Sequence, residues 1–356
     1  METTTYQDEL ENTRKILANP ESTLPARIFS TTGRIVCKIT RRKEPLPWQY
    51  NFAVLALVVQ LPTLFISLLL NETPQWNKLG FLWMGYLELG LFASVLAHVA
   101  VFYVYKNMNM YVVDTIQKKD DLIDLQKVFA RVGSLKNSII FTAFFTLFWC
   151  ISFSWFLSDY INQFIGIGLL VGTIIFGLLT GPAVYLEGCY YFFITHLGNY
   201  SYVLNETSPA HSQAIYRISR IITVLIYSIA VFIAFATMAV SFNTGAVVLA
   251  VLIGWIPTIV YFFASQLAIG QIVTIAKWKT LNRIQEQIRS LNNSDITNKD
   301  NIEAINRLMD YHERIRSTPN STLNIRTSLN FLNQLALPIV GLLLANIDKV
   351  RQFFFP

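Results

Sequence analysis

Long apolar stretches alternate with short polar segments along the whole chain. A helix needs about 20 apolar residues to cross a hydrocarbon core about 30 Å thick. Six stretches meet this requirement: residues 52–70, 80–105, 138–157, 163–185, 219–241 and 246–272. The pattern therefore predicts an all-α fold, a polytopic bundle with six strong membrane spans and helical extensions on one side.

Composition agrees with this pattern and excludes several classes of protein. Charged residues make up 14% of the chain and hydrophobic residues 53%, whereas an average soluble domain has about 25% charged residues. A soluble nucleic-acid binder is excluded in spite of the net charge of +6. The first fifty residues are polar and basic, so we expect no cleaved signal peptide and insertion through the first internal span.

The apolar run 166–198 is longer than one crossing needs, and charge placement decides how often it crosses. With a single crossing and a cytoplasmic N-terminus, 27 of the 28 Lys and Arg residues lie on one side, as the positive-inside rule requires. A second crossing would move the basic residues of the C-terminal region outside. We therefore expect a multi-pass protein of a plasma membrane or bacterial inner membrane, with almost no outer face.

The chain then divides into four regions. Residues 1–50 form a basic, amphipathic N-terminal segment, 51–275 the membrane bundle, 276–320 a helical hairpin, and 321–356 an apolar membrane-associated segment. Within the bundle, 106–136 and 187–218 are cytoplasmic loops with helices of their own. Residues 329–347 are either an interfacial or re-entrant segment or a seventh span, because polar residues and Pro338 interrupt them.

Two cytoplasmic loops carry helical or aromatic patterns. After the N-cap candidates Asp120 and Asp121, apolar residues recur at helical spacing up to Gly133; they are Leu122, Leu125, Phe129 and Val132. The loop that follows the fourth span contains four tyrosines, Tyr190, Tyr191, Tyr200 and Tyr202. We expect these tyrosines at headgroup level or half-buried, either along the interface or in a packed helical extension.

The sixth span continues into a coiled-coil-like pattern. Its seam consists of Leu281, Ile284, Ile288 and Leu291, which follow a three-four-three spacing. After a polar turn, a second stripe contains Ile302, Ile305, Leu308, Met309, His312 and Ile315. The two segments predict an antiparallel hairpin, whose seam packs on itself or on a neighbouring subunit.

Residues 24–43 combine apolar side chains with six basic ones just before the first span. This composition is typical of a segment that contacts anionic headgroups on the cytoplasmic side. The alternative is that the charges only enforce topology.

The fourth span is rich in glycine, and two small-xxx-small pairs face different directions. Gly168 and Gly172 lie on one helical face, and Gly177 and Gly181 on roughly the opposite one. Such pairs allow close helix packing, and a hinge or pore-lining face is the alternative use. Pro62, Pro182 and Pro257 are candidate kinks, because each removes a backbone hydrogen bond.

Three ionisable residues form the candidate intramembrane polar site. Glu88 lies about eight residues inside the second span, near the bilayer middle, where a carboxylate must be neutral, paired or in contact with water. His98 and Glu187 lie near the inner boundary and either pair across helices or meet interfacial water. Each of these positions also has a purely structural explanation.

Enzymatic and metal signatures are absent from the sequence. It contains no nucleotide-binding P-loop, zinc-protease or nucleophile-elbow motif. The three cysteines and four histidines show no metal-ligand spacing. We therefore expect no catalytic residue, no cofactor and no metal.

These features favour a homo-oligomeric channel or pore-like protein whose cytoplasmic helices assemble and gate it. Its path would be lined by Glu88 or by polar residues such as Thr173, Thr180 and Ser241. The alternative is a non-conducting scaffold or adaptor that recruits a cytoplasmic protein partner. A secondary transporter ranks third, because no matched pair of broken helices is evident.

Overall fold

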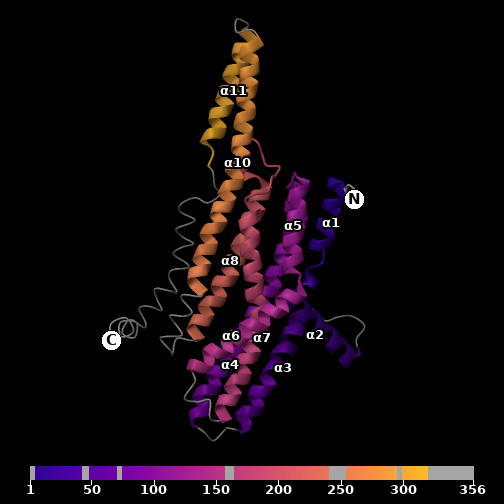
Figure 1. Ribbon diagram of the computed structural model, residues 1–356, viewed down its shortest axis with the longest axis vertical. Coiled ribbons are helices and arrows are strands. Elements are labelled where there is room, and N and C mark those ends of the chain that lie inside the picture. Colours follow the sequence, from indigo (N-terminus) through magenta and orange to yellow (C-terminus); the bar gives the residue numbers. More distant parts are fainter. Residues whose placement is uncertain are drawn as a thin grey trace, which may run out of the picture.

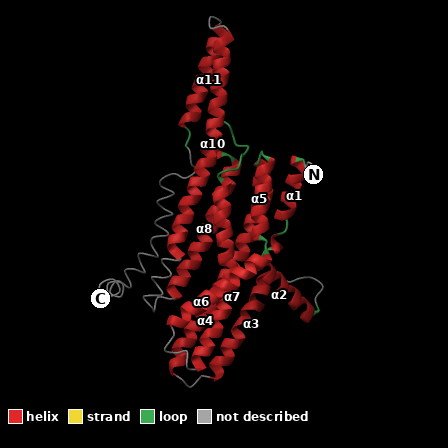
Figure 2. Cartoon of the chain, viewed as in Figure 1, coloured by secondary structure: helices red, strands yellow, loops and turns green. Residues whose placement is uncertain are grey.

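The computed structural model describes residues 5–41, 48–69, 74–156, 164–239, 254–294 and 299–319. These residues are almost entirely helical and contain no strand (Figure 2). The α-helices are α1 (Tyr6–Leu17), α2 (Leu24–Thr40), α3 (Trp48–Leu69), α4 (Pro74–Asn107), α5 (Lys119–Val132), α6 (Leu135–Phe156), α7 (Phe164–Leu197), α8 (Gln213–Ala239), α10 (Ile256–Ser294) and α11 (Lys299–Ser317). The predicted segment 329–347 lies outside the described residues.

Five helices of the described part are long and apolar enough to cross a membrane, as expected of an integral membrane protein. They are α4, α6, α7, α8 and α10. The first predicted span lies in α3, a helix of 22 residues whose side chains are described as far as Leu61. The total of six spans therefore stays a prediction, whereas the all-helical character is confirmed.

Helix α7 occupies the centre of the bundle, with α6 on one side and α4 on the other (Figure 1). It runs as one continuous helix through Pro182 to Leu197. The aromatic tail is a helical extension of α7 as far as Leu197, and Tyr200 and Tyr202 lie in the loop that follows. Tyr190, Tyr200 and Tyr202 are fully buried rather than half-buried, and Tyr191 is exposed.

Close packing at α7 depends on small residues. A Cβ added at Gly177 would lie 2.9 Å from Thr146 Cα, and one added at Gly181 would lie 3.0 Å from Thr142 Cα. Both threonines belong to α6 and donate their hydroxyls to carbonyls of their own helix, so neither leaves an unsatisfied polar group in the contact. The Gly177 and Gly181 face is therefore used for packing within one chain.

A compact region of polar helices, here called the head, sits at one end of the bundle. It consists of α1, α5 and residues 198–212, and Figure 1 shows α1 and α5 side by side. The predicted apolar face of α5 is fully buried. Two acidic side chains attach the segment after α7 to α5: Asp124 accepts the Tyr200 hydroxyl at 2.8 Å, and Asp121 accepts the Ser201 N–H at 2.7 Å.

The start of α5 differs from the sequence prediction. Its N-cap is Lys118, without a side-chain cap, and Asp120 and Asp121 fall in the first turn. Carboxylates in a first turn still interact favourably with the helix dipole. The Asp121 carboxylate accepts a hydrogen bond from Ser201, which is distant in sequence. Local sequence could not indicate this contact.

The second half of α10 and all of α11 form a hairpin that projects beyond the head (Figure 1). Leu281 and Ile284 are buried against Ile315, and further apolar residues pack around them: Ile288, Leu308 and Tyr311. Two members of the predicted second stripe, Ile302 and Met309, are instead about half exposed on the outside. At 100° per residue, Ile302 and Met309 lie roughly 120–140° around α11 from Ile315. Tyr311 lies close to Ile315 on the inner face instead.

Lys277 of α10 links the start of the hairpin to the C-terminal end of α11. Its ammonium group donates to the carbonyl oxygens of Arg316 and Thr318 at 2.8 and 2.7 Å. Arg316 lies in the last turn of α11 and Thr318 just after it, where backbone acceptors lack partners within the helix. A cation at this position also interacts favourably with the negative end of the helix dipole.

Candidate functional site

Glu88 on α4 forms a polar pair with Gln60 on α3. The Gln60 side-chain amide donates to a Glu88 carboxylate oxygen at 3.1 Å. Gln60 is the thirteenth of the 22 residues of α3, so the pair lies near the middle of an apolar helix. Glu88 is exposed and Gln60 half-buried, and exposed Leu57 and Leu61 flank them on α3.

On a surface that faces lipid, this polar pair would be energetically unfavourable. Ionisable residues at such depth normally face the bundle interior, a water-filled cavity or a protein partner. One hydrogen bond from an amide does not replace the hydration of a carboxylate. Within the described residues of one chain, the Gln60–Glu88 pair therefore requires a neutral carboxyl group, or water or another protein surface beside it.

A second polar position lies in a cavity between α4, α7 and α8. The cavity has a volume of about 60 Å³ and is walled on α4 by small residues, Ala93, Ala97 and Ala100. Glu187 and Tyr190 of α7 and Ser228 of α8 supply its polar groups. Space of this size accommodates a few water molecules where polar partners are present.

Two tyrosines near Glu187 have buried hydroxyl groups. The Tyr190 and Tyr261 hydroxyls are buried and have no hydrogen-bond partner in the part of the chain that the structure describes. The Tyr261 ring, on α10, lies tilted against the Tyr191 ring, with 5.8 Å between the centroids. Buried polar groups are normally paired, so hydroxyls left over beside a carboxyl indicate a position for water or a small polar ligand.

Glu187 was named from the sequence, but the cavity and the other residues that line it were not predicted. Glu187 and Tyr190 are three residues apart and thus share a helical face, which was the one available signal. The alanines that open the space and Ser228 on α8 come from distant parts of the chain. Only the packing of α4, α7 and α8 brings them together.

His98 occupies a different place from Glu187. Its ring lies between Phe29 of α2 and Phe102 of α4, at 4.7 Å from each centroid. It does not contribute to the cavity wall that contains Glu187. The sequence left two alternatives for His98 and Glu187, pairing across helices or contact with interfacial water, and both stay predictions.

No protein-family model, curated protein or solved structure matches this chain. The functional argument therefore rests on the chain's own residues.

The other candidate positions fall into structural roles or outside the described side chains. Gly172 and Thr173 are buried, and Thr180 donates its hydroxyl to the backbone carbonyl oxygen of Phe176 in its own helix. Pro257 is the second residue of α10 and directly follows the π-helical residues 254 and 255, so its role as a kink stays a prediction. The backbone at Pro62 and Gly168 is helical, while their side-chain surroundings and Ser241 lie outside the described part.

Among the described residues, no group of three or more His, Cys, Asp or Glu is arranged to hold a metal ion. The oxygen donors near Glu187 are one carboxyl, one aliphatic hydroxyl and phenols. This set suits water or a proton better than a divalent cation, which requires more carboxylate or carbonyl oxygens.

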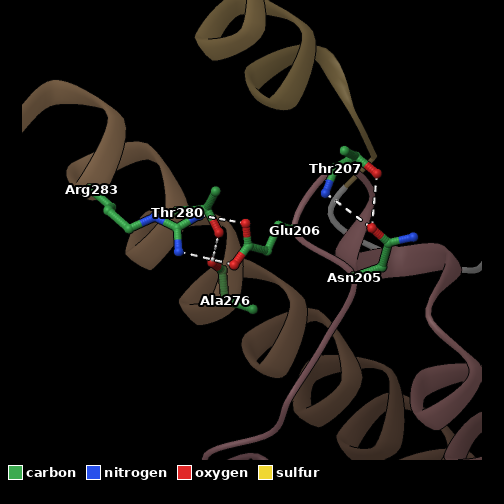
Figure 3. Close-up of polar contacts among 6 residues, drawn as sticks. All are labelled: Asn205, Glu206, Thr207, Ala276, Thr280 and Arg283. Carbon is green, nitrogen blue, oxygen red and sulfur yellow. Dashed lines mark hydrogen bonds and ion pairs between the residues drawn. The ribbon is translucent and has the colours of Figure 1, made fainter. Parts of the chain in front are cut away.

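An ion pair attaches the hairpin to the head (Figure 3). Arg283 of α10 donates two hydrogen bonds to the Glu206 carboxylate, of which the Nη1–Oε1 bond is 2.9 Å long. The neighbouring loop is shaped by Asn205, whose side-chain oxygen accepts the N–H and the hydroxyl of Thr207. The segment between α7 and α8 is thereby coupled to α10.

We expect this attachment to weaken at low pH. The hydrogen bond from Arg283 is the main cause that lowers the pKa of Glu206 below its usual 4.5. A carboxyl whose pKa is lowered by folding adds stability above its unfolded pKa, and this stability is lost as the pH falls through the lowered value. The protection factors of the backbone amides in residues 205–212, which compare measured exchange with intrinsic exchange at the same pH, should therefore fall roughly twofold to fivefold below about pH 4.

The variant Glu206→Gln should show the faster exchange already at neutral pH. Glu303→Gln is the matched control, because Glu303 also pairs with an exposed arginine, Arg307, but only within α11. Equal exchange at residues 205–212 in both variants would contradict the attachment.

Proposed function

We propose that the protein is a homo-oligomeric membrane channel or pore-like protein whose cytoplasmic helices assemble and gate it. The observation that carries the proposal is the exposed Gln60–Glu88 pair near the middle of the membrane helices. A second copy placed on the α3–α4 face would cover the exposed leucines and enclose the pair. Carboxylates from several copies would then line a shared aqueous path.

The orientation that belongs to this proposal follows from charge. With the head and hairpin on the cytoplasmic side of a plasma membrane or bacterial inner membrane, the arrangement obeys the positive-inside rule. The Arg283–Glu206 attachment then offers a route by which movement of the hairpin reaches the segment between α7 and α8. Regulation from the cytoplasm would act through that segment.

The test is ion flux through liposomes that contain the purified full chain, together with the subunit number from mass measurement in nanodiscs. We expect a closed oligomer and a cation flux that Glu88→Gln reduces about tenfold or more, since it removes the charge that attracts the ion. Glu286→Gln is the control, because Glu286 is exposed on the hairpin. Unchanged flux in Glu88→Gln, or a monomer, would overturn the proposal.

A non-conducting scaffold is the second candidate, and the projecting hairpin favours it. Ile302 and Met309 are seven residues apart on α11 and about half exposed, so they present an apolar face to a cytoplasmic protein partner. Under this function Glu88→Gln leaves activity intact. Ile284→Asp, which places a charge in the buried seam, abolishes recruitment.

A further inference from the structure

Helix α2 has three distinct faces. Its buried face consists of Ala26, Phe29, Gly33 and Val36, which follow a three-four-three spacing and pack on the bundle. Phe29 contacts the His98 ring of α4, and Gly33 lies against the Asn51 side chain of α3. This face fixes α2 on the bundle and determines which side chains point away from it.

A basic stripe runs along the outer side of α2. Arg27, Arg34, Lys38 and Arg41 are all exposed. At 100° per residue Arg27, Arg34 and Lys38 lie within about 40° of one another, and Arg41 is the C-cap residue that follows the helix. Beside the stripe, Ile35 and Ile39 are 55% and 75% exposed, so an apolar strip separates the basic stripe from the buried face.

Little in the described part of the chain neutralises this stripe. Glu21 contributes one long contact to Arg34, at 3.8 Å, and its carbonyl accepts Arg27 Nε at 3.2 Å. No ion pair among the described residues joins Lys38 or Arg41 to a carboxylate. The stripe is therefore available to anions from outside the chain.

The place of α2 in the fold indicates which anions these are. Only residues 42–47 separate it in sequence from α3, which is strongly apolar. Figure 1 shows α2 between the head and the membrane helices, at the end of α3. This is the level at which a chain enters a bilayer, where exposed isoleucines meet acyl chains and neighbouring cations meet phosphates.

We propose that the outer face of α2 is a binding surface for anionic phospholipid headgroups. Ile35 and Ile39 insert at the boundary between the headgroups and the acyl chains. Arg34, Lys38 and Arg41 contact lipid phosphates. Charge complementarity and the position beside α3 select a lipid surface over an acidic protein segment. The proposal does not depend on whether the chain conducts ions.

The experiment counts lipids retained by the purified full chain in detergent, by native mass spectrometry, during titration with phosphatidylglycerol or phosphatidylcholine. We expect preferential retention of phosphatidylglycerol. The double variant Arg34→Gln/Lys38→Gln should weaken it roughly tenfold, since each basic residue near a membrane surface contributes a several-fold factor. Retention of phosphatidylcholine should not change.

The matched control is Arg307→Gln/Arg314→Gln, which removes the same charge from exposed positions of α11. It should retain phosphatidylglycerol like the unmodified chain. A conservative variant, Lys38→Arg, should also bind normally and shows that the position tolerates change. Equal loss in the control pair, or equal binding of the two lipids by the unmodified chain, would overturn the proposal.

Discussion

Replacing Phe129 with alanine should lower the free energy of unfolding by about 3–5 kcal/mol, the usual cost of removing a buried aromatic side chain. Phe129 is 2% exposed on α5. Its ring meets Tyr105 of α4 edge-on at 5.0 Å and Phe193 of α7 at 5.4 Å. The variant leaves a cavity where the head joins two membrane helices, and rigid helices on two sides restrict its collapse.

The measurement is equilibrium unfolding of the full chain in detergent micelles, followed by circular dichroism. Phe144→Ala is the control, since Phe144 on α6 is 69% exposed and its truncation leaves no internal cavity. It should change the unfolding free energy by less than about 1 kcal/mol. If both variants lost the same stability, Phe129 would not be the link between head and bundle.

Gly177→Leu should lower the free energy of unfolding by about 3 kcal/mol, the upper part of the range for overpacking. The first added carbon would already lie 2.9 Å from Thr146 Cα. Because that atom belongs to the backbone of α6, no rotation of a side chain relieves the clash. The two helices must move apart, which also disturbs the Gly181–Thr142 contact one turn away.

The same helix supplies the matched control for this change. A Cβ at Gly188 would meet nothing within 4 Å, so Gly188→Leu should not lower the unfolding free energy and should raise it by at most about 1 kcal/mol, through the higher helix propensity of leucine. Comparison of the two variants by the same unfolding measurement separates overpacking from the general effect of replacing glycine in α7. Equal stabilities would show that α6 and α7 adapt without cost.

The helices and the glycine contacts were predictable to different degrees. The fourth span was expected to pack closely on two faces, and α7 does lie between α6 and α4. Its sequence left open whether Gly177 and Gly181 meet another subunit, a pore or the same chain. The contacts with Thr146 and Thr142 answer this for one face, and no local pattern encodes a partner some 35 residues away.

In the candidate site, too, some residues could be predicted from the sequence and others could not. Glu88 was singled out because an ionisable side chain inside an apolar span carries a high free-energy cost, whichever face of the helix it occupies. Its partner Gln60 was not, because glutamine carries no comparable signal. The cavity at Glu187 depends on three alanines of α4 and on Ser228 of α8, and alanine in a membrane helix indicates no cavity by itself.

What the sequence determined alone was the helical character, the apolar stretches, the buried face of α5 and the seam at Leu281 and Ile284. Each follows from residues close together in the chain, because helix periodicity and bilayer thickness act over a few turns. The tertiary structure decided which face of α7 meets α6, where His98 lies relative to Glu187, and that Asp121 serves a neighbouring loop. These depend on which helices become neighbours, and that is set by the packing of the whole bundle.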